Sequence, residues 1–510
     1  FMNLIKSTGT FSIFVIISRV LGYLRDVLIA IYLGSGPIAD AFFVAFRIPN
    51  TFRRLFAEGS FNAAFVPSYS SELTRGKIKA KNFANNVFNF LMLGLLVLVI
   101  IIEILMPGFI FIIAPGFYED QAKLELTTLL TRITFPFLLF ISLASFFSAI
   151  LNSHNKFGIA AAAPIILNLI LILIIFIGKR SNDDLVIYLS YGVSISGLIQ
   201  LIFVYFFAKK YFSPNFNFRL KITKKIKLFF NKFLPGIFSS GVTQINILVG
   251  TIIASFQASA VSYLYYADRI YQINLAIAGI AIGTVILPNL SRYIKTNNNK
   301  KINFIQNKSF ELCLFLSLPA SMALIVGSEQ ITSALFGYGA FDSASVKNSA
   351  NALFYFALGL PAFAIIKVFS TFLFARDNTK SPFYYSLISV LINIFLSIFY
   401  FEKVGFIIIP IATSISSWVN AFLLFLKLSE NNYFKLKNIL NVANLKIVLI
   451  SSLSIYLFYI FINTFEKYLA YDSELKLFTV ILLVTFTILI YILMSLITKT
   501  FKYSDIKLKY

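Results

Sequence analysis

The chain has 510 residues, of which 58% are hydrophobic and 13% are charged, and its formal net charge is +23. Soluble globular proteins contain about 45–50% apolar and about 25% charged residues, so this composition excludes an ordinary soluble domain. Apolar runs recur from end to end, each long enough to cross roughly 30 Å of hydrocarbon. The single cysteine, Cys313, and the single histidine, His154, exclude a disulfide framework and a nucleophile–histidine–acid catalytic set. The sequence therefore predicts an all-α polytopic membrane protein.

Fourteen transmembrane helices are predicted from the apolar segments. In chain order they cover residues 9–33, 39–70, 83–114, 124–151, 157–178, 185–208, 233–256, 260–291, 304–327, 347–375, 382–401, 404–428, 445–464 and 475–498. A basic stretch separates the sixth helix from the seventh. Its segment 223–232 is expected to form an amphipathic helix that lies at the membrane surface.

Lysine and arginine concentrate in alternate connections between these helices. The basic set comprises Arg75, Lys77, Lys79, Lys81, the 209–232 linker, Arg292, Lys295, Lys300, Lys301 and four lysines of the tail. The intervening connections, such as 115–123 and 328–346, are poor in positive charge. The positive-inside rule therefore predicts that both termini are cytoplasmic. Basic loops next to anionic lipid of the inner leaflet account for the net positive charge, so no nucleic-acid partner is expected.

An internal repeat is indicated by residues that are infrequent inside apolar helices. A shift of 221 residues superposes Pro67 on Pro288, Asn82 on Asn303 and Gly116 on Gly337, and a shift of 225 superposes Pro136 on Pro361 and Asn168 on Asn393. Six crossings return the chain to its starting side, so the repeat is parallel. The prediction is an N-terminal lobe over 2–232, a C-terminal lobe over 233–428 and two further helices over 429–510, enclosing a central cavity.

Charged residues inside the predicted helices are the candidates for function. A charge at the bilayer centre costs about 2.5–3.5 kcal/mol on insertion scales, so such residues face protein or water. They are Arg19, Arg25 and Asp26 in the first helix, Asp40, Arg47, Arg53, Arg54 and Glu58 in the second, and Asp268 and Arg269 in the eighth. The pair Pro49-Asn50 interrupts the second helix and is expected to kink it.

Two interpretations of these charges remain open. Ion pairs that hold helices together would explain Arg25 with Asp26 or Asp40, and would also explain Asp268. The whole set, however, contains two more positive than negative charges. The planar guanidinium of arginine matches phosphate oxygens through paired hydrogen bonds. We therefore expect a binding site for an anion, and a diphosphate-bearing substrate would suit it.

Three segments, Ser18–Asp26, Asp40–Asn50 and Arg53–Gly59, resemble the MurJ (MviN) lipid II flippases. The stretch Tyr265–Arg269, followed by Leu287-Pro288, resembles the eighth helix of that family. The resemblance covers essentially the whole chain. It implies a member of the multidrug/oligosaccharidyl-lipid/polysaccharide exporter superfamily in the bacterial cytoplasmic (inner) membrane. Such a protein moves the undecaprenyl-diphosphate-linked peptidoglycan precursor outward by alternating access, for cell wall biogenesis.

The resemblance also assigns roles to residues. It implies substrate contacts for Arg19, Arg25, Arg53 and Arg269 with Asp40, to which the charge argument adds Arg47 and Arg54. Supporting or gating roles are expected for Ser18, Asp26, Asn50, Glu58, Asp268 and Gln272. The last two helices are expected to form a groove for the polyprenyl tail. No catalytic residue, metal ligand or cofactor is expected.

The energy source is left open by two departures from relatives. Some relatives have an acidic residue where this chain has Gln272, and some place a sodium-binding carboxylate where it has Gly250. Sodium coupling therefore does not carry over with the resemblance. Coupling to the membrane potential or to another cation is considered, with no ion site assigned.

The expected partners are lipid II and membrane lipids, with a monomeric chain that can meet the cell-wall synthesis machinery. The alternatives are a flippase for another polyprenyl-diphosphate-linked oligosaccharide, of O-antigen or teichoic type, and a drug extruder. Drug extruders usually bind cations, so an arginine-rich cavity argues against a drug extruder. A membrane-embedded polyprenyl glycosyltransferase needs catalytic loops, and the connections 115–123 and 328–346 are too short for a catalytic domain. A structural scaffold would not need a charged cavity.

Overall fold

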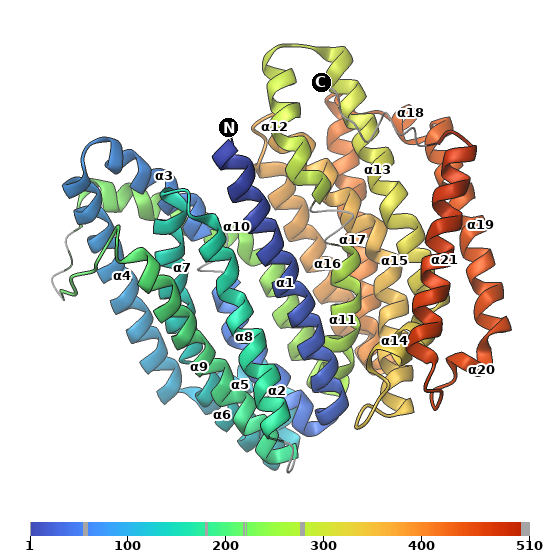
Figure 1. Cartoon of the computed structure of the whole chain (residues 1–510), viewed down its shortest axis with the longest axis horizontal. Coiled ribbons are helices and arrows are strands. Elements are labelled where there is room, and N and C mark those ends of the chain that lie inside the picture. The colour runs from blue at the N-terminus through green and yellow to red at the C-terminus, as the bar shows by residue number, and fades with distance from the viewer. Residues whose placement is uncertain are drawn as a thin grey trace. The chain divides into compact units, whose positions relative to one another are not determined.

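A computed structural model describes residues 2–54, 60–178, 182–217, 220, 222–275 and 281–500, and the described residues form helices without strands. Two compact units divide the chain, residues 1–262 and residues 263–510. In Figure 1 the first runs from blue to green and the second from green to red. The boundary lies inside α11, whereas the predicted lobes meet at residue 232. The division into lobes stays a prediction, and each unit is described by itself.

The first unit is built from ten α-helices, a short 3-10 helix and the start of α11. They are α1 (Met2–Leu33), α2 (Pro37–Arg53), α3 (Ser60–Thr74), α4 (Lys77–Ile104), α5 (Met106–Ile113), η2 (Pro115–Glu119), α6 (Gln121–Thr134), α7 (Phe137–Ser153), α8 (Phe157–Ile177), α9 (Asn182–Ala208), α10 (Lys224–Ala254) and α11 (Ala260–Leu275). Helix α1 packs on α8, α2 on α6, and α7 on α9 (Figure 1). A buried aromatic cluster that includes Phe65 and Phe146 joins α3 to α7.

The second unit continues α11 and adds, among the described residues, ten α-helices and a short 3-10 helix. They are α12 (Ala281–Lys295), α13 (Asn299–Val326), α14 (Ser328–Phe336), α15 (Ser343–Phe374), α16 (Lys380–Val404), η4 (Gly405–Ile407), α17 (Ile408–Glu430), α18 (Leu436–Ile439), α19 (Val442–Thr464), α20 (Glu466–Leu469) and α21 (Lys476–Ile497). Helix α15 packs against both α13 and α17. Helix α19 packs on α13, and α21 packs on α19 and α14 (Figure 1).

Each of the fourteen predicted segments coincides with one helix or with two consecutive helices. Within the described residues, nine helical segments are long and apolar enough to cross a membrane, and Lys380–Glu430 counts as one although it holds α16 and α17. The count of fourteen therefore stays a prediction. The lengths of α3, α4 and α5 are 15, 28 and 8 residues, and those of α12, α13 and α14 are 15, 28 and 9. This succession agrees with the repeat.

The structure corrects one prediction, the separate surface helix over 223–232. Helix α10 is continuous from Lys224 to Ala254, and Thr223 caps it by accepting the N–H of Ile226. The apolar face of the segment is buried in the first unit, because Ile226 and Phe229 are 1% and 2% exposed. The Phe229 ring packs against aromatic rings of α3 and α4. An amphipathic pattern does not reveal whether its apolar face meets lipid or protein, and here it meets protein.

Candidate functional site

Arg25 of α1 is buried in the first unit and donates three hydrogen bonds there. Its Nε and one terminal nitrogen donate to Asp26 Oδ1 at 3.0 and 2.7 Å, and the other donates to Asn168 Oδ1 of α8 at 2.9 Å. The amide of Asn168 in turn donates to the carbonyl of Ser18 at 2.9 Å. Gly22 lies beside this contact, and a Cβ there would meet the Asn168 amide at 3.4 Å, an ordinary van der Waals distance. Of the two acids considered for Arg25, the structure selects Asp26.

The other arginines of the first unit are more accessible. Arg19 is exposed, six residues before Arg25 on the same helix, and no described residue forms a hydrogen bond or ion pair with it. Arg47 is half-buried and donates to Thr251 Oγ1 of α10 at 2.7 Å. Arg54 is also half-buried, just beyond the end of α2. The accessible arginines among the predicted site residues of this unit therefore lie on α1 and at the end of α2.

Three further residues of the second predicted helix, Arg53, Glu58 and Asn50, lie in α2 or just after it in the chain. Arg53 is described as the last residue of α2, and its side chain lies outside the described part. Glu58 lies outside the described residues altogether. Asn50 donates to the carbonyl of Phe46 at 2.9 Å, one turn earlier in α2. Helix α2 continues through Pro49.

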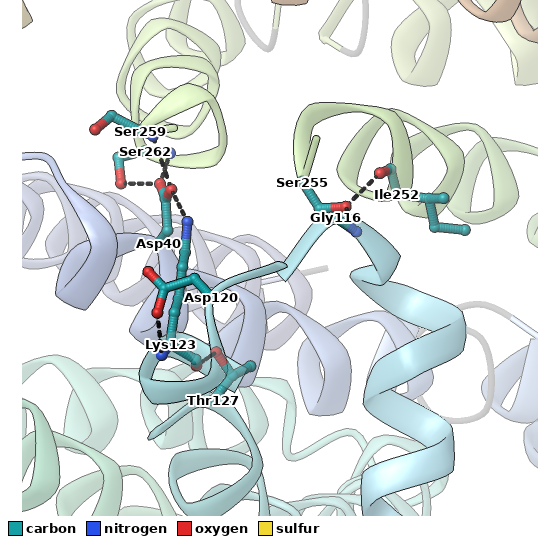
Figure 2. Close-up of polar contacts among 9 residues, drawn as sticks. All are labelled: Asp40, Gly116, Asp120, Lys123, Thr127, Ile252, Ser255, Ser259 and Ser262. Carbon is teal, nitrogen blue, oxygen red and sulfur yellow. Dashed lines mark hydrogen bonds and ion pairs between the residues drawn. The ribbon is translucent and has the colours of Figure 1, made fainter. Parts of the chain in front are cut away.

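Asp40, near the start of α2, is fully buried and accepts four hydrogen bonds (Figure 2). Its Oδ2 lies 2.8 Å from Nζ of Lys123 on α6 and 3.0 Å from the N–H of Ser259. Its Oδ1 accepts from the N–H and the hydroxyl of Ser262 at 2.9 and 2.5 Å. Asp40 therefore binds the N-terminus of α11, where free N–H groups and the helix dipole favour an anion.

This contact, which we call the Asp40 network, includes a strained residue. Ser259 has a φ of 61°, in the left-handed region that non-glycine residues rarely adopt. Such a conformation costs of the order of 1–3 kcal/mol and persists where surrounding contacts enforce it. Here the N–H that it presents is bound by the Asp40 carboxylate. The network therefore fixes the turn between α10 and α11.

A second contact holds the same turn (Figure 2). The N–H of Gly116, in η2, donates to the hydroxyl of Ser255 at 3.0 Å, and Ser255 caps the end of α10. A Cβ at position 116 would lie 2.4 Å from backbone atoms of Ser255, so only glycine permits this approach. The segments 115–123 and 255–259, together with the start of α2, form what we call the outer end of the first unit, because the charge distribution predicts that it faces away from the cytoplasm.

In the second unit, α11 carries three further predicted residues. Arg269 donates to the hydroxyl of Tyr265 at 3.0 Å, and its guanidinium carbon lies 4.5 Å from the centre of that ring. The amide of Gln272 donates to Asp268 one turn earlier. All three are half-buried. Asp268 therefore pairs with Gln272 within the same helix.

Sequence reasoning missed three polar residues. The sequence indicates Lys123 only as a loop charge and Asn168 only as a marker of the repeat. Their partners, Asp40 and Arg25, are too distant in the chain for the sequence to reveal. Lys367 is exposed on α15, one turn from Phe363, whose ring lies 5.6 Å from that of Tyr271 on α11. Within the described residues, no three His, Cys, Asp or Glu side chains converge on a metal position.

Solved structures with a similar fold are membrane transporters. One described as lipid II flippase MurJ in an inward closed conformation aligns with a TM-score of 0.82 at 29% identity, over 96% of this chain and 98% of that one. An inward-facing multidrug resistance MATE family transporter of the MOP superfamily aligns with a TM-score of 0.68, over 81% of this chain and 94% of that one. Its 16% identity shows a shared fold alone. The class is thus a polytopic transporter with this superfamily's fold.

The particular family follows from the sequence relatives. The family model described as lipid II flippase MurJ matches residues 29–480. The probable lipid II flippase MurJ of Rhizobium tropici is 40% identical over 438 residues, 85% of this chain and 82% of that protein. Its counterpart from Rhizobium meliloti (strain 1021) is 42% identical over 430 residues, covering 83% and 80%. The chain belongs to the MurJ lipid II flippase family, which confirms the resemblance.

Proposed function

We propose that this chain moves lipid II, the undecaprenyl-diphosphate-linked peptidoglycan precursor, from the inner to the outer leaflet of the bacterial cytoplasmic membrane. Membership of the MurJ family is the observation that carries the proposal. The mechanism is alternating access, in which the head group enters from the cytoplasm and leaves on the other side. Both termini are cytoplasmic in this scheme. The chain acts as a monomer and meets cell-wall synthesis proteins through its substrate.

The arginines have different roles in this proposal. Arg19 is exposed and has no partner among the described residues, so its guanidinium is available to the diphosphate. Arg25 is buried and bound to Asp26 and Asn168, so it fixes α1 against α8 and positions Arg19. We assign substrate contacts also to Arg53 and Arg269, which the family motifs include, and to Lys367 on the accessible face of α15.

Asp40 acts as part of a gate in this proposal. Its carboxylate is fully buried and fully hydrogen-bonded, so a substrate phosphate would gain nothing from it. Its partners are Lys123 and the first N–H groups of α11, the helix that connects the two units. Breaking these contacts releases the start of α11, and re-forming them fixes it. Charge transfer through the membrane potential is worth about 2.3 kcal/mol per charge per 100 mV and would bias such a change.

The test uses a bacterial strain whose own lipid II flippase can be depleted. Lipid II exposed on the outer leaflet is measured by its cleavage with a hydrolase added from the periplasmic side. Expression of this chain should restore cleavage. Cleavable lipid II that stays absent, with normal membrane insertion of the chain, would refute the proposed function.

Arginine variants test the site within the same assay. Arg19→Ala removes a charge-assisted contact of about 1.5–3 kcal/mol, so we expect translocation to fall about tenfold to a hundredfold. Arg75→Ala is the matched control, because Arg75 is an exposed arginine at the end of α3 that pairs with Glu72. Arg19→Lys keeps the charge but loses the paired hydrogen-bond geometry of the guanidinium. Its translocation rate should therefore lie between those of R19A and R75A. Equal translocation rates for R19A and R75A would show that Arg19 does not contact the substrate.

A further inference from the structure

A basic pocket lies in the second unit, and none of the residues assigned to the substrate lines it. It has a volume of about 450 Å³, and side chains of α13, of α19 and of the segment after α21 line it. The lining residues are Phe304, Lys308, Val442, Ala443, Lys446, Lys499 and Thr500. Three of these seven residues are lysines, and no lining residue is acidic. We call this the basic pocket.

Lys446 and Lys499 keep donors available. Lys446 donates to the carbonyl of Thr498 at 3.1 Å, which uses one of the three N–H bonds of its amine. Lys308 pairs with Glu311 at 2.8 Å, so one carboxylate offsets one of the three cations. Lys499 is exposed, and its side-chain amine forms no hydrogen bond or ion pair with a described residue. The pocket therefore keeps a net positive charge.

The N-terminus of α19 adds further donors at the same place. Asn441 caps the helix by accepting the N–H of Asn444 at 2.7 Å. The N–H groups of Val442 and Ala443, both in the pocket lining, have no hydrogen-bond partner among the described residues. The positive end of a helix dipole and free N–H groups favour phosphate. Lysine amines from three segments and a helix N-terminus thus converge on one cavity.

An exposed apolar stripe leads away from the pocket along α19. Leu449, Leu453 and Tyr456 follow Lys446 at helical spacing on one face, and they are 68%, 51% and 61% exposed. In a membrane protein such side chains meet lipid tails. The pocket also lies next to the connections that the distribution of lysine and arginine predicts to be cytoplasmic. A phosphate in the pocket would therefore sit at headgroup level with its acyl chains along this stripe.

We propose that the basic pocket binds the phosphate of an anionic phospholipid of the inner leaflet. Clusters of lysine between helices on the cytoplasmic side are the arrangement that anionic headgroups recognise, and each lysine changes affinity about fivefold. The pocket is separate from the translocated substrate and would hold α13, α19 and the end of α21 together.

The experiment uses the purified full-length protein in nanodiscs of phosphatidylcholine with increasing phosphatidylglycerol. Native mass spectrometry counts the phospholipids that remain bound. We expect one phosphatidylglycerol to be retained in preference to phosphatidylcholine. Lys446→Gln with Lys499→Gln should weaken this retention about 25-fold, since each lysine contributes about fivefold. Lys77→Gln with Lys79→Gln is the matched control, because both lysines are exposed at the predicted cytoplasmic side of the first unit.

Two outcomes would overturn the proposal. The first is equal loss of phosphatidylglycerol in both double variants, which would show that general charge and not the pocket attracts the lipid. The second is lysine-dependent binding of inorganic phosphate, added alone to protein in neutral detergent, without preference among phospholipids. That result would assign the pocket to a free anion. Unchanged thermal unfolding of K446Q/K499Q establishes that the variant is folded.

Discussion

Two loops at corresponding places in the repeat each hold a lysine under an aromatic ring. In the first unit, Nζ of Lys123 lies 3.8 Å from the centre of the Phe117 ring. In the second, Nζ of Lys476 lies 4.2 Å from the centre of the Tyr338 ring. A shift of 221 residues superposes Phe117 on Tyr338, next to Gly116 on Gly337. The lysines themselves are not related, because Lys123 begins α6 and Lys476 begins α21, outside the repeat.

The partners of the two amines differ in kind. Lys123 binds the carboxylate of Asp40, which also binds the start of α11. Lys476 is 3% exposed and donates to the carbonyls of Gly337 and Tyr471, with the Tyr471 ring 4.5 Å away. The helix dipole disfavours a positively charged lysine at a helix N-terminus. The two carbonyls and the two aromatic rings offset this unfavourable interaction. The first arrangement is a charge pair that can exchange partners, whereas the second is a fixed anchor for α21.

The largest effect is expected from Asp40→Asn. The change leaves the Lys123 amine buried without a countercharge, which costs about 3–5 kcal/mol. It also weakens the hydrogen bonds between residue 40 and the start of α11, so lipid II translocation should be lost. Denaturation of the purified protein and the outer-leaflet assay measure the two effects. Asp120→Asn is the control, because Asp120 is exposed and asparagine caps helices equally well.

A double variant separates stability from gating. Asp40→Asn with Lys123→Met removes both charges, so stability should largely recover while translocation stays low. Recovery of translocation along with stability would mean that Asp40 acts only as a structural ion pair. The proposed gate would then be excluded.

A smaller effect is expected from Lys476→Met. The two carbonyls lose their donor, which costs about 1–3 kcal/mol of unfolding free energy, while the methionine keeps the aliphatic contacts. Translocation per folded molecule should stay near the wild-type rate, because an anchor does not move. Lys467→Met on the exposed face of α20 serves as the control. Loss of translocation at normal stability would make the two loops functionally alike.

The aromatic rings give a matched pair of substitutions. Phe117→Leu and Tyr338→Leu each remove a cation–π contact of about 0.5–2 kcal/mol. The loss should be larger at Phe117, which is 1% exposed, because a cavity is also created there. Tyr338 is half-buried, and the Lys476 amine keeps its carbonyl partners. Equal losses in thermal unfolding would contradict the difference between the loops.

The smallest effect concerns pH and lies away from both loops. Burial lowers the pKa of His154, whose ring stacks on Tyr211 with centres 4.2 Å apart. The unfolded chain then binds more protons than the folded one, so stability falls as the pH drops below about 6.5 and levels off below the lowered folded pKa. His154→Gln should abolish this slope between pH 7 and pH 5. A slope that persists in the variant would assign it to other groups.

The sequence by itself determined the membrane class, the helical segments and the family, because hydropathy, charge and motifs are local properties of the chain. It also predicted the repeat and located the charged residues. Their partners were decided only by the tertiary structure: Arg25 meets Asn168, 143 residues away, and Asp40 meets Lys123 and Ser262, 83 and 222 residues away. From the sequence alone, either Asp26 or Asp40 could be the ion-pair partner of Arg25, because both are acids predicted to lie within the membrane. Packing of α1 on α8 and of α2 on α6 settled which groups came within hydrogen-bond distance.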